Sequence, residues 1–196
     1  PNSNVTVTEE IQLALSDCSN FGGGPFGVVA NAGDAQFKGV EVEVDADPIE
    51  GLSFDSSLSY LTSKYKSIQP AVGASVQITD PATSAPKWKW SAGLQYKADL
   101  GSAGSLTPRF DISYNGAMFQ GRGLGVPYSL PAYTLANAHL MWRNEKGDLS
   151  VTGEVSNLFD KYYYTSIFDG VYAFSGTAYQ QVARPREFSI TVRKNF

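Results

Sequence analysis

The last ten residues, EFSITVRKNF (187–196), alternate between apolar and polar side chains. Successive side chains of an extended strand point to opposite faces, so one face collects the apolar members: Phe188, Ile190, Val192 and Phe196. Lys194 interrupts this face near the chain end, where its long side chain can reach a polar interface. Two interpretations fit: a half-buried strand of a water-soluble protein, or a membrane strand with lipid on one side and water on the other.

Composition argues against several classes of function. The chain has 196 residues and a formal net charge of -4, so it offers no strongly basic surface for nucleic acid. The single cysteine, Cys18, cannot form an internal disulfide, and the single histidine, His139, leaves no His/Cys cluster for zinc or nucleophilic catalysis. We therefore expect no enzymatic activity, no metal site and no cofactor. We interpret Cys18 and His139 as packing or lining residues.

The chain contains no candidate for a membrane-spanning helix. No stretch approaches the roughly 20 apolar residues that such a helix needs, and uncharged runs are broken by Gly, Ser and Pro. The sequence begins at Pro1 without a basic and apolar export signal. If the protein is exported, we expect that processing removed a signal or that this chain is a piece of a longer one.

Segments with a two-residue period recur, and they exceed the usual globular strand of about five or six residues. The segment at 37–47 alternates valine with a row of acids: Glu41, Glu43, Asp45 and Asp47. Comparable segments lie at about 5–15, 52–65, 87–97, 106–118, 132–143, 149–164 and 187–196. They predict about eight strands and no sustained helix.

The connections between these segments alternate in length. Short turns follow Asp47, Leu100 and Asn144. Long polar or glycine-rich connections span 17–32, 67–85, 120–131 and 165–184. Transmembrane barrels of bacteria sort their connections in this way, with short periplasmic turns and long outer loops, whereas a soluble sandwich has no reason to do so.

Aromatic residues mark both ends of one predicted strand face. Trp88 and Trp90 lie at the start of the 87–97 segment and Tyr96 at its end, as two interfacial girdles would place them. The sequence therefore predicts an all-β fold, a transmembrane antiparallel β-barrel in the bacterial outer membrane.

Several passages resemble one family, the C-terminal part of the barrel of TonB-dependent outer-membrane receptors. Their order and spacing, more than any single one, carry the resemblance from about Ala30 onward. The passages are Asn31–Gly33 with Lys38–Glu43, Ala85–Trp88, Tyr133–Ala138, Val155–Tyr163, and Arg184–Phe188 with the final Phe196.

The resemblance implies a barrel of about 22 antiparallel strands around an N-terminal plug that carries a TonB-contacting segment. Residues 1–196 would then be a single-domain fragment, the last third of the barrel, with the plug absent from this sequence. The implied function is TonB-dependent active transport of a scarce nutrient: a ferric siderophore first, with cobalamin or a carbohydrate as further candidates. The implied partners are the extracellular nutrient, the TonB complex through the missing plug, the barrel-assembly machinery and outer-membrane lipid.

Two other functions remain open at this point. Eight strands could close on themselves as a small passive barrel or porin-like pore, although small inward residues such as Ser57, Ser59 and Ser113 would fill its interior poorly. An outer-membrane hydrolase would need an outward-facing catalytic group around a histidine, and the lone mid-strand His139 argues against it.

The last long connection holds the candidate ligand contacts: Phe168, Asp169, Tyr172, Phe174 and Tyr179. Aromatic side chains on exposed loops can stack on a siderophore, a corrin or a sugar, and a carboxylate can accept hydrogen bonds. The alternative is that these residues pack loop against loop or against the barrel wall.

Four further features have structural interpretations. We expect the acids of 41–47 to be a hydrated row on the lumen wall, paired with Lys or Arg of the adjacent strand or the plug, rather than a catalytic or calcium site. His139 should line the inner side, hydrogen-bonded. The glycine-rich 121–125 lacks the helix and lysine of a phosphate loop and should be a mobile tip. Alternation fails at Asn157, which predicts a bulge.

The alternating apolar face that ends on Phe196 resembles the signal read by the barrel-assembly machinery, for which we nominate Phe188, Ile190, Val192 and Phe196. Replacing Phe196 by Asp, or deleting it, should lower the amount of receptor inserted in the outer membrane. Quantitative immunoblotting of membrane fractions measures this, and normal insertion of the variant would refute it.

Overall fold

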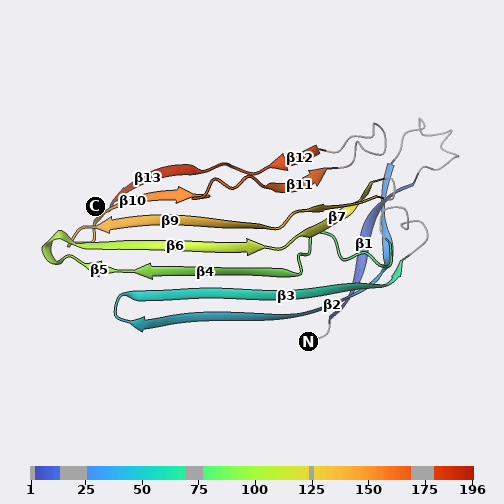
Figure 1. Ribbon diagram of the computed structural model, residues 1–196, viewed down its shortest axis with the longest axis horizontal. Helices are drawn as coiled ribbons and strands as arrows, with labels where there is room; N and C mark the ends of the chain where they lie inside the picture. The colour runs from blue at the N-terminus through green and yellow to red at the C-terminus, as the bar shows by residue number, and fades with distance from the viewer. Residues whose placement is uncertain (1–2, 14–25, 69–76, 124–125, 169–178) are drawn as a thin grey trace.

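The computed structural model describes residues 3–13, 26–68, 77–123, 126–168 and 179–196 (Figure 1). Its main sheet is an antiparallel meander in which strands that follow one another along the chain lie side by side. The order across the sheet is β1 (Ser3–Leu13), β2 (Phe26–Ile49), β3 (Leu52–Ile68), β4 (Trp88–Tyr96), β6 (Ser105–Asn115), β9 (Tyr133–Arg143), β10 (Leu149–Ser156) and β13 (Glu187–Lys194). The short β5 (Ala98–Asp99) follows β4 and pairs with β6.

Two hairpins extend the meander at one end. One joins β7 (Met118–Gly123) to β8 (Val126–Leu130), and the other joins β11 (Tyr164–Phe168) to β12 (Tyr179–Val182). The antiparallel architecture agrees with the sequence prediction, but the connections at 120–131 and 165–184 are shorter than predicted. Both contain paired strand, and 26–32, predicted as loop, belongs to β2, because backbone pairing continues where side-chain alternation has stopped.

The short turns collect at one end of the sheet, beside the C-terminus (Figure 1). Gly51, with a φ of 81°, ends the turn between β2 and β3, and the 3-10 turn η1 (Gly101–Ala103) precedes β6. At the third turn Lys194 Nζ forms an ion pair with Asp148. The Lys194 hydrogen bond, followed by one from Asn144, lowers the pKa of Asp148 below its ordinary value. We call this the short-turn end.

One face of the sheet is an exposed apolar belt. Paired residues of adjacent strands point to the same side, so the belt is read in rows; one row is Ala46, Phe54, Leu94, Phe110, Ala138, Val155 and Phe188. Leu94 is 50% exposed, Phe110 39% and Leu140 47%, although all three lie on central strands. Such a continuous apolar face is stable only against another apolar medium.

The nominated assembly residues continue this belt to the last strand. Phe188, Ile190 and Val192 are exposed on β13, and Phe196 follows just beyond it. Their recognition by the assembly machinery stays a prediction.

Aromatic pairs border the apolar belt at the end opposite the short-turn end. The rings of Tyr60 and Trp88 lie 4.4 Å apart, and those of Trp90 and Tyr114 6.1 Å apart and stacked. Toward the short-turn end, Trp142 donates its indole N–H to the carbonyl of Ala103.

Through the register, Trp142 lies level with Leu106 and Ala98. The ten residue steps from Trp88 to Ala98 span about 34 Å along the strand. At a strand tilt of about 40° this is a height of about 26 Å, close to that of the apolar band of a membrane barrel.

Among the described residues, no helix is both long and apolar enough to cross a membrane. The buried apolar side chains of this part are few: Ala35, Tyr65, Ala82, Phe119, Leu130 and Ala136. The described sheet therefore has almost no conventional core, and its apolar residues face outward instead.

The main sheet is interrupted after β10, where the chain leaves the ladder from Asn157 to Tyr163. Asn157 has a φ of 50° and is buried; its backbone N–H donates to Asn137 Oδ1, and its side-chain amide binds both the N–H and the carbonyl of Lys161. The predicted irregularity is at the right residue, but it is longer than a single-residue bulge, because the side-chain amide replaces ladder hydrogen bonds over the following turn.

A second set of bonds ties this segment to the chain before β13. The Asn157 amide also donates to the carbonyl of Arg184, Asp160 accepts the backbone N–H of Arg186, and Arg186 Nη1 donates to the carbonyl of Leu158. The β11–β12 hairpin is therefore connected to the main sheet through a hydrogen-bonded junction rather than a continuous ladder.

Candidate functional site

The face opposite the apolar belt is mainly polar. One row of paired residues on it consists of Ser53, Gln95, Arg109, His139, Glu154 and Ser189. We call this face the polar wall. His139 lies on it, as the alternation predicted; its expected hydrogen bond is absent among the described residues.

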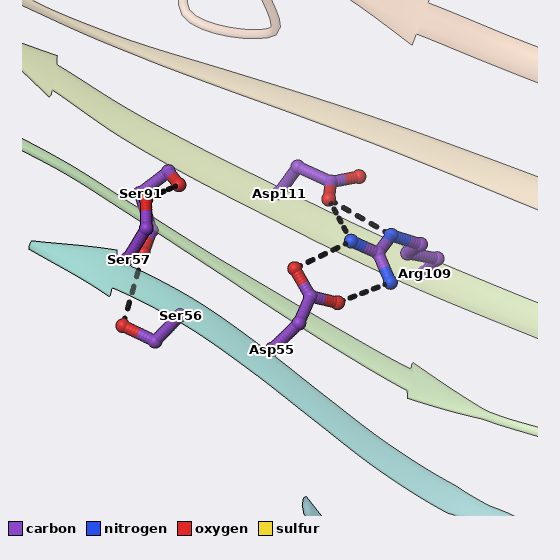
Figure 2. A network of polar contacts seen from close by, with 6 residues as sticks. All are labelled: Asp55, Ser56, Ser57, Ser91, Arg109 and Asp111. Atoms are coloured by element: carbon purple, nitrogen blue, oxygen red, sulfur yellow. Dashed lines mark hydrogen bonds and ion pairs between the residues drawn. The ribbon is translucent and has the colours of Figure 1, made fainter. Parts of the chain in front are cut away.

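An arginine bridges three strands at the centre of the polar wall (Figure 2). Arg109 on β6 reaches across β4 to Asp55 on β3, with Nη1 2.6 Å from Oδ1 and Nη2 3.0 Å from Oδ2. The other side of the same guanidinium contacts Asp111, with Nε 2.8 Å and Nη2 2.7 Å from Oδ1. Two-pronged contacts of this kind fix the orientation of both partners.

The bridge depends on a missing side chain. Gly93 on β4 lies between Asp55 and Asp111 in the register, directly beneath the guanidinium. A Cβ built on Gly93 would lie 2.1 Å from Arg109 Nη2 and 2.7 Å from Asp55 Oδ2. Only glycine at this position leaves the ion pairs undisturbed.

Toward the end of the sheet opposite the short turns, the polar wall carries small hydroxyl side chains. Ser57 and Ser91 share a hydrogen bond of 2.8 Å (Figure 2). Ser113 is the register partner of Ser91 on the next strand. A hollow of about 630 Å³ opens over them, bordered by Glu43, Lys89, Asn115 and Tyr133 among others. Small polar side chains keep this part of the wall hydrated and free of bulk.

The acidic row of β2 runs along the same face. Its register partners are Ser59 for Glu41, Ser57 for Glu43 and Asp55 for Asp45. The predicted pairing with Lys or Arg of the adjacent strand is wrong within the described part of the chain, where Glu41 accepts a hydrogen bond only from Ser59, at 3.5 Å. The reason is that β3 presents hydroxyls and an acid at these positions. No group of three or more metal-ligating side chains occurs in this part either. Pairing of the acids with the plug, the other predicted partner, stays a prediction.

The candidate ligand residues are only partly within the described chain. Phe168 and Tyr179 are register partners at the last rung of the β11–β12 hairpin, and Tyr179 is 60% exposed. The intervening Asp169, Tyr172 and Phe174 lie outside the described residues. The backbone register thus places these two residues opposite each other at the base of the connection.

The glycine-rich segment at 121–125 is not simply a loop tip. Gly121 pairs with Tyr128 and Gly123 with Val126 in the β7–β8 hairpin, and only 124–125 fall outside the described residues. Its glycines serve a hairpin, which explains why the helix and lysine of a phosphate loop do not follow.

Sequence reasoning missed the Arg109 bridge. Alternation places Asp55, Arg109 and Asp111 on the polar face, but nothing in the alternation says which strands become neighbours. The available signal was Gly93, since an isolated glycine inside an alternating strand often marks a close approach by another group.

The role of Gly93 can be tested against a glycine in open surroundings. Gly93→Ala should displace Arg109 and lower the free energy of unfolding of the full-length receptor by about 1 to 2 kcal/mol. Gly153→Ala is the matched control, because a Cβ there meets nothing within 4 Å. Urea unfolding followed by tryptophan fluorescence measures both. In an Arg109→Ala background, Gly93→Ala should cost almost nothing; an additive cost would contradict the mechanism.

Comparisons with known proteins agree with this architecture. Solved structures with similar folds include the ferric yersiniabactin uptake receptor FyuA of Yersinia pestis (21% identity, TM-score 0.72, 86% of this chain and 25% of that chain). They also include the ferric-catecholate import receptor Fiu of E. coli K12 (20%, 0.70, 100% and 24%) and the ferric preacinetobactin receptor BauA of Acinetobacter baumannii (18%, 0.67, 100% and 26%).

The chain thus spans about a quarter of these receptors. Residues 5–158 match the family model described as "TonB dependent receptor-like, beta-barrel". This family resides in the outer membrane of Gram-negative bacteria, so the apolar belt faces lipid and the polar wall faces the barrel lumen. The chain belongs to the TonB-dependent receptors and forms part of their β-barrel.

Proposed function

We propose that the protein containing this chain imports a ferric siderophore across the outer membrane with energy supplied through TonB. The observation that carries the proposal is the family match over residues 5–158, combined with a barrel wall whose lumen side is mainly polar. Support for the siderophore comes from the structural neighbours, several of which are receptors for ferric siderophores.

The polar wall suits the passage of a hydrated, bulky solute. The serines around the 630 Å³ hollow offer hydroxyl donors and acceptors without strong charge. Arg109 is already occupied on both sides by Asp55 and Asp111, so it is not free to trap an anionic complex. The wall would therefore bind a passing ligand weakly at many points, which permits its release.

We place ligand recognition at the far end of the β11–β12 hairpin. Phe168 and Tyr179 form its last rung, and Asp169, Tyr172 and Phe174 lie in the connection between them. Aromatic rings there would stack on the aromatic or planar groups of a siderophore, and Asp169 would accept its hydrogen bonds.

A passive pore remains the second candidate. Within the described residues β1 and β13 occupy opposite edges of the sheet and do not pair, so the eight strands do not close into a small barrel. A larger porin-like pore differs from an active receptor in its energy requirement, which an uptake assay resolves.

Uptake of radiolabelled iron, supplied as a catecholate or a hydroxamate complex, tests the proposal in cells that express the full-length receptor. We expect uptake of one complex that stops when tonB is deleted or the proton-motive force is collapsed. Uptake that persists without TonB would support the pore, and failure to take up either complex would contradict the siderophore assignment.

The recognition site has its own test. Tyr179→Ala should raise the half-saturating concentration of the transported complex by about threefold to tenfold, the loss expected for one aromatic contact. Tyr96→Ala is the matched control, because Tyr96 is also an exposed tyrosine but lies on the lipid-facing belt toward the short-turn end. Equal effects of the two substitutions on the half-saturating concentration would refute the placement.

A further inference from the structure

Two exposed lysines, Lys38 on β2 and Lys64 on β3, lie on the lipid-facing side of the sheet, and two more exposed lysines, Lys66 and Lys87, lie next to them in the chain or the sheet. We call this group the lysine patch. Lys38 pairs with Thr62 and Lys64 with Gln36, in the same run of rungs that pairs Val40 with Tyr60 on the apolar belt. Because facing side chains recur every second residue, Lys38 and Lys64 point to the lipid side, diagonally adjacent at about 7 to 8 Å.

The other two lysines complete the patch. Lys66 is the extra residue of a bulge, since Asp34 pairs with Ser67 and Ala35 with Tyr65. Lys87 immediately precedes β4, and its Nζ lies 5.5 Å from the centre of the Tyr60 ring, which is on the belt side.

The patch sits just beyond an aromatic girdle. Tyr60 and Trp88 contact each other at 4.4 Å at the edge of the apolar belt, and the lysines follow within a few residues on the side away from the short turns. Aromatic girdles lie at the headgroup level of a membrane, and long connections of such barrels face the outside. The lysines are therefore at the level of the headgroups of the outer leaflet.

The charges of these four lysines have no ion-pair partner within the described part of the chain. Asp34, an acid on the same face of β2, accepts a hydrogen bond from Ser67 at 3.1 Å. The acids of β2, from Glu41 to Asp47, lie on the opposite, lumen-facing side. Four neighbouring ammonium groups repel one another unless an external anion neutralises them.

We propose that the lysine patch binds the phosphate groups of a phosphorylated lipid in the outer leaflet of the outer membrane. The apolar belt below the girdle would hold the acyl chains of the same molecule, while the ammonium groups above it contact the phosphates. Charge complementarity selects this occupant, because an uncharged headgroup would leave all four lysines unneutralised. The site is independent of the nutrient that the receptor transports.

The test uses the full-length receptor in nanodiscs of zwitterionic phospholipid, titrated with diphosphorylated lipid A and with the same lipid after removal of its phosphates. Native mass spectrometry counts the bound lipid. We expect Lys38→Gln with Lys64→Gln to weaken binding of the phosphorylated form by about tenfold or more, since each lysine near an anionic surface contributes about fivefold. Binding should also weaken as salt concentration rises.

Two controls separate charge from other effects. Lys38→Arg with Lys64→Arg keeps the charge and should keep the binding. Lys97→Gln with Lys146→Gln removes the same charge at exposed positions toward the short-turn end and should leave binding unchanged. Heat-modifiable mobility on gels shows that each variant is folded.

Unchanged binding in the Lys38/Lys64 glutamine variant, or an equal loss in the Lys97/Lys146 control, would overturn the proposal. If the glutamine variant does not fold, the wild-type receptor decides: equal affinity for the phosphorylated and dephosphorylated lipid would refute the site, and a salt-sensitive preference for the phosphorylated form would support it.

Discussion

A backbone that crosses hydrocarbon must satisfy every N–H and C=O group within the protein, because no water is available to do so. In this chain the antiparallel ladder provides these hydrogen bonds for the main sheet. One interruption of the ladder shows what must replace them. Where the ladder stops after β10, the side chains of Asn157 and Asp160 and the guanidinium of Arg186 take over its hydrogen bonds. The polar residues of this junction are explained by that need.

The pleat of the same ladder divides the chemistry between two faces. On β2, Lys38 and Val40 point to lipid while Glu41 and Glu43 point to the lumen. Lysines therefore gather on the lipid-facing side beyond the aromatic girdle, and acids gather on the lumen side. The lysines and the acids of β2 are nevertheless close in sequence. Arg109 is the balancing element on the inner side: without it, Asp55 on β3 and Asp111 on β6 would lie as unneutralised carboxylates.

The sequence predicts features that follow from local periodicity. The faces of the 37–47 and 187–196 segments, the short turns and the aromatic ends of 87–97 all follow from alternation and turn residues, and the structure agrees. Other features depend on which strands become neighbours or on side chains that replace backbone bonds. The position of Gly93 beneath Arg109 depends on which strands become neighbours. The long junction at Asn157 depends on a side chain that replaces backbone hydrogen bonds. The β7–β8 hairpin was not predicted, because a glycine-rich strand shows no alternation of polar and apolar side chains. The recognition residues could be nominated only by type, and the structure adds the pairing of Phe168 with Tyr179.

The central claim is that adjacent residues of one strand face lipid and lumen in turn. Spin labels on single cysteines at Ala138, His139, Leu140 and Met141 of β9, in the full-length receptor with Cys18→Ser, test it through their collision rates with oxygen, which concentrates in the bilayer. The structure predicts high rates at Ala138 and Leu140 and low rates at His139 and Met141. Rates without this alternation, or with the opposite phase, would contradict the lipid-out, lumen-in arrangement.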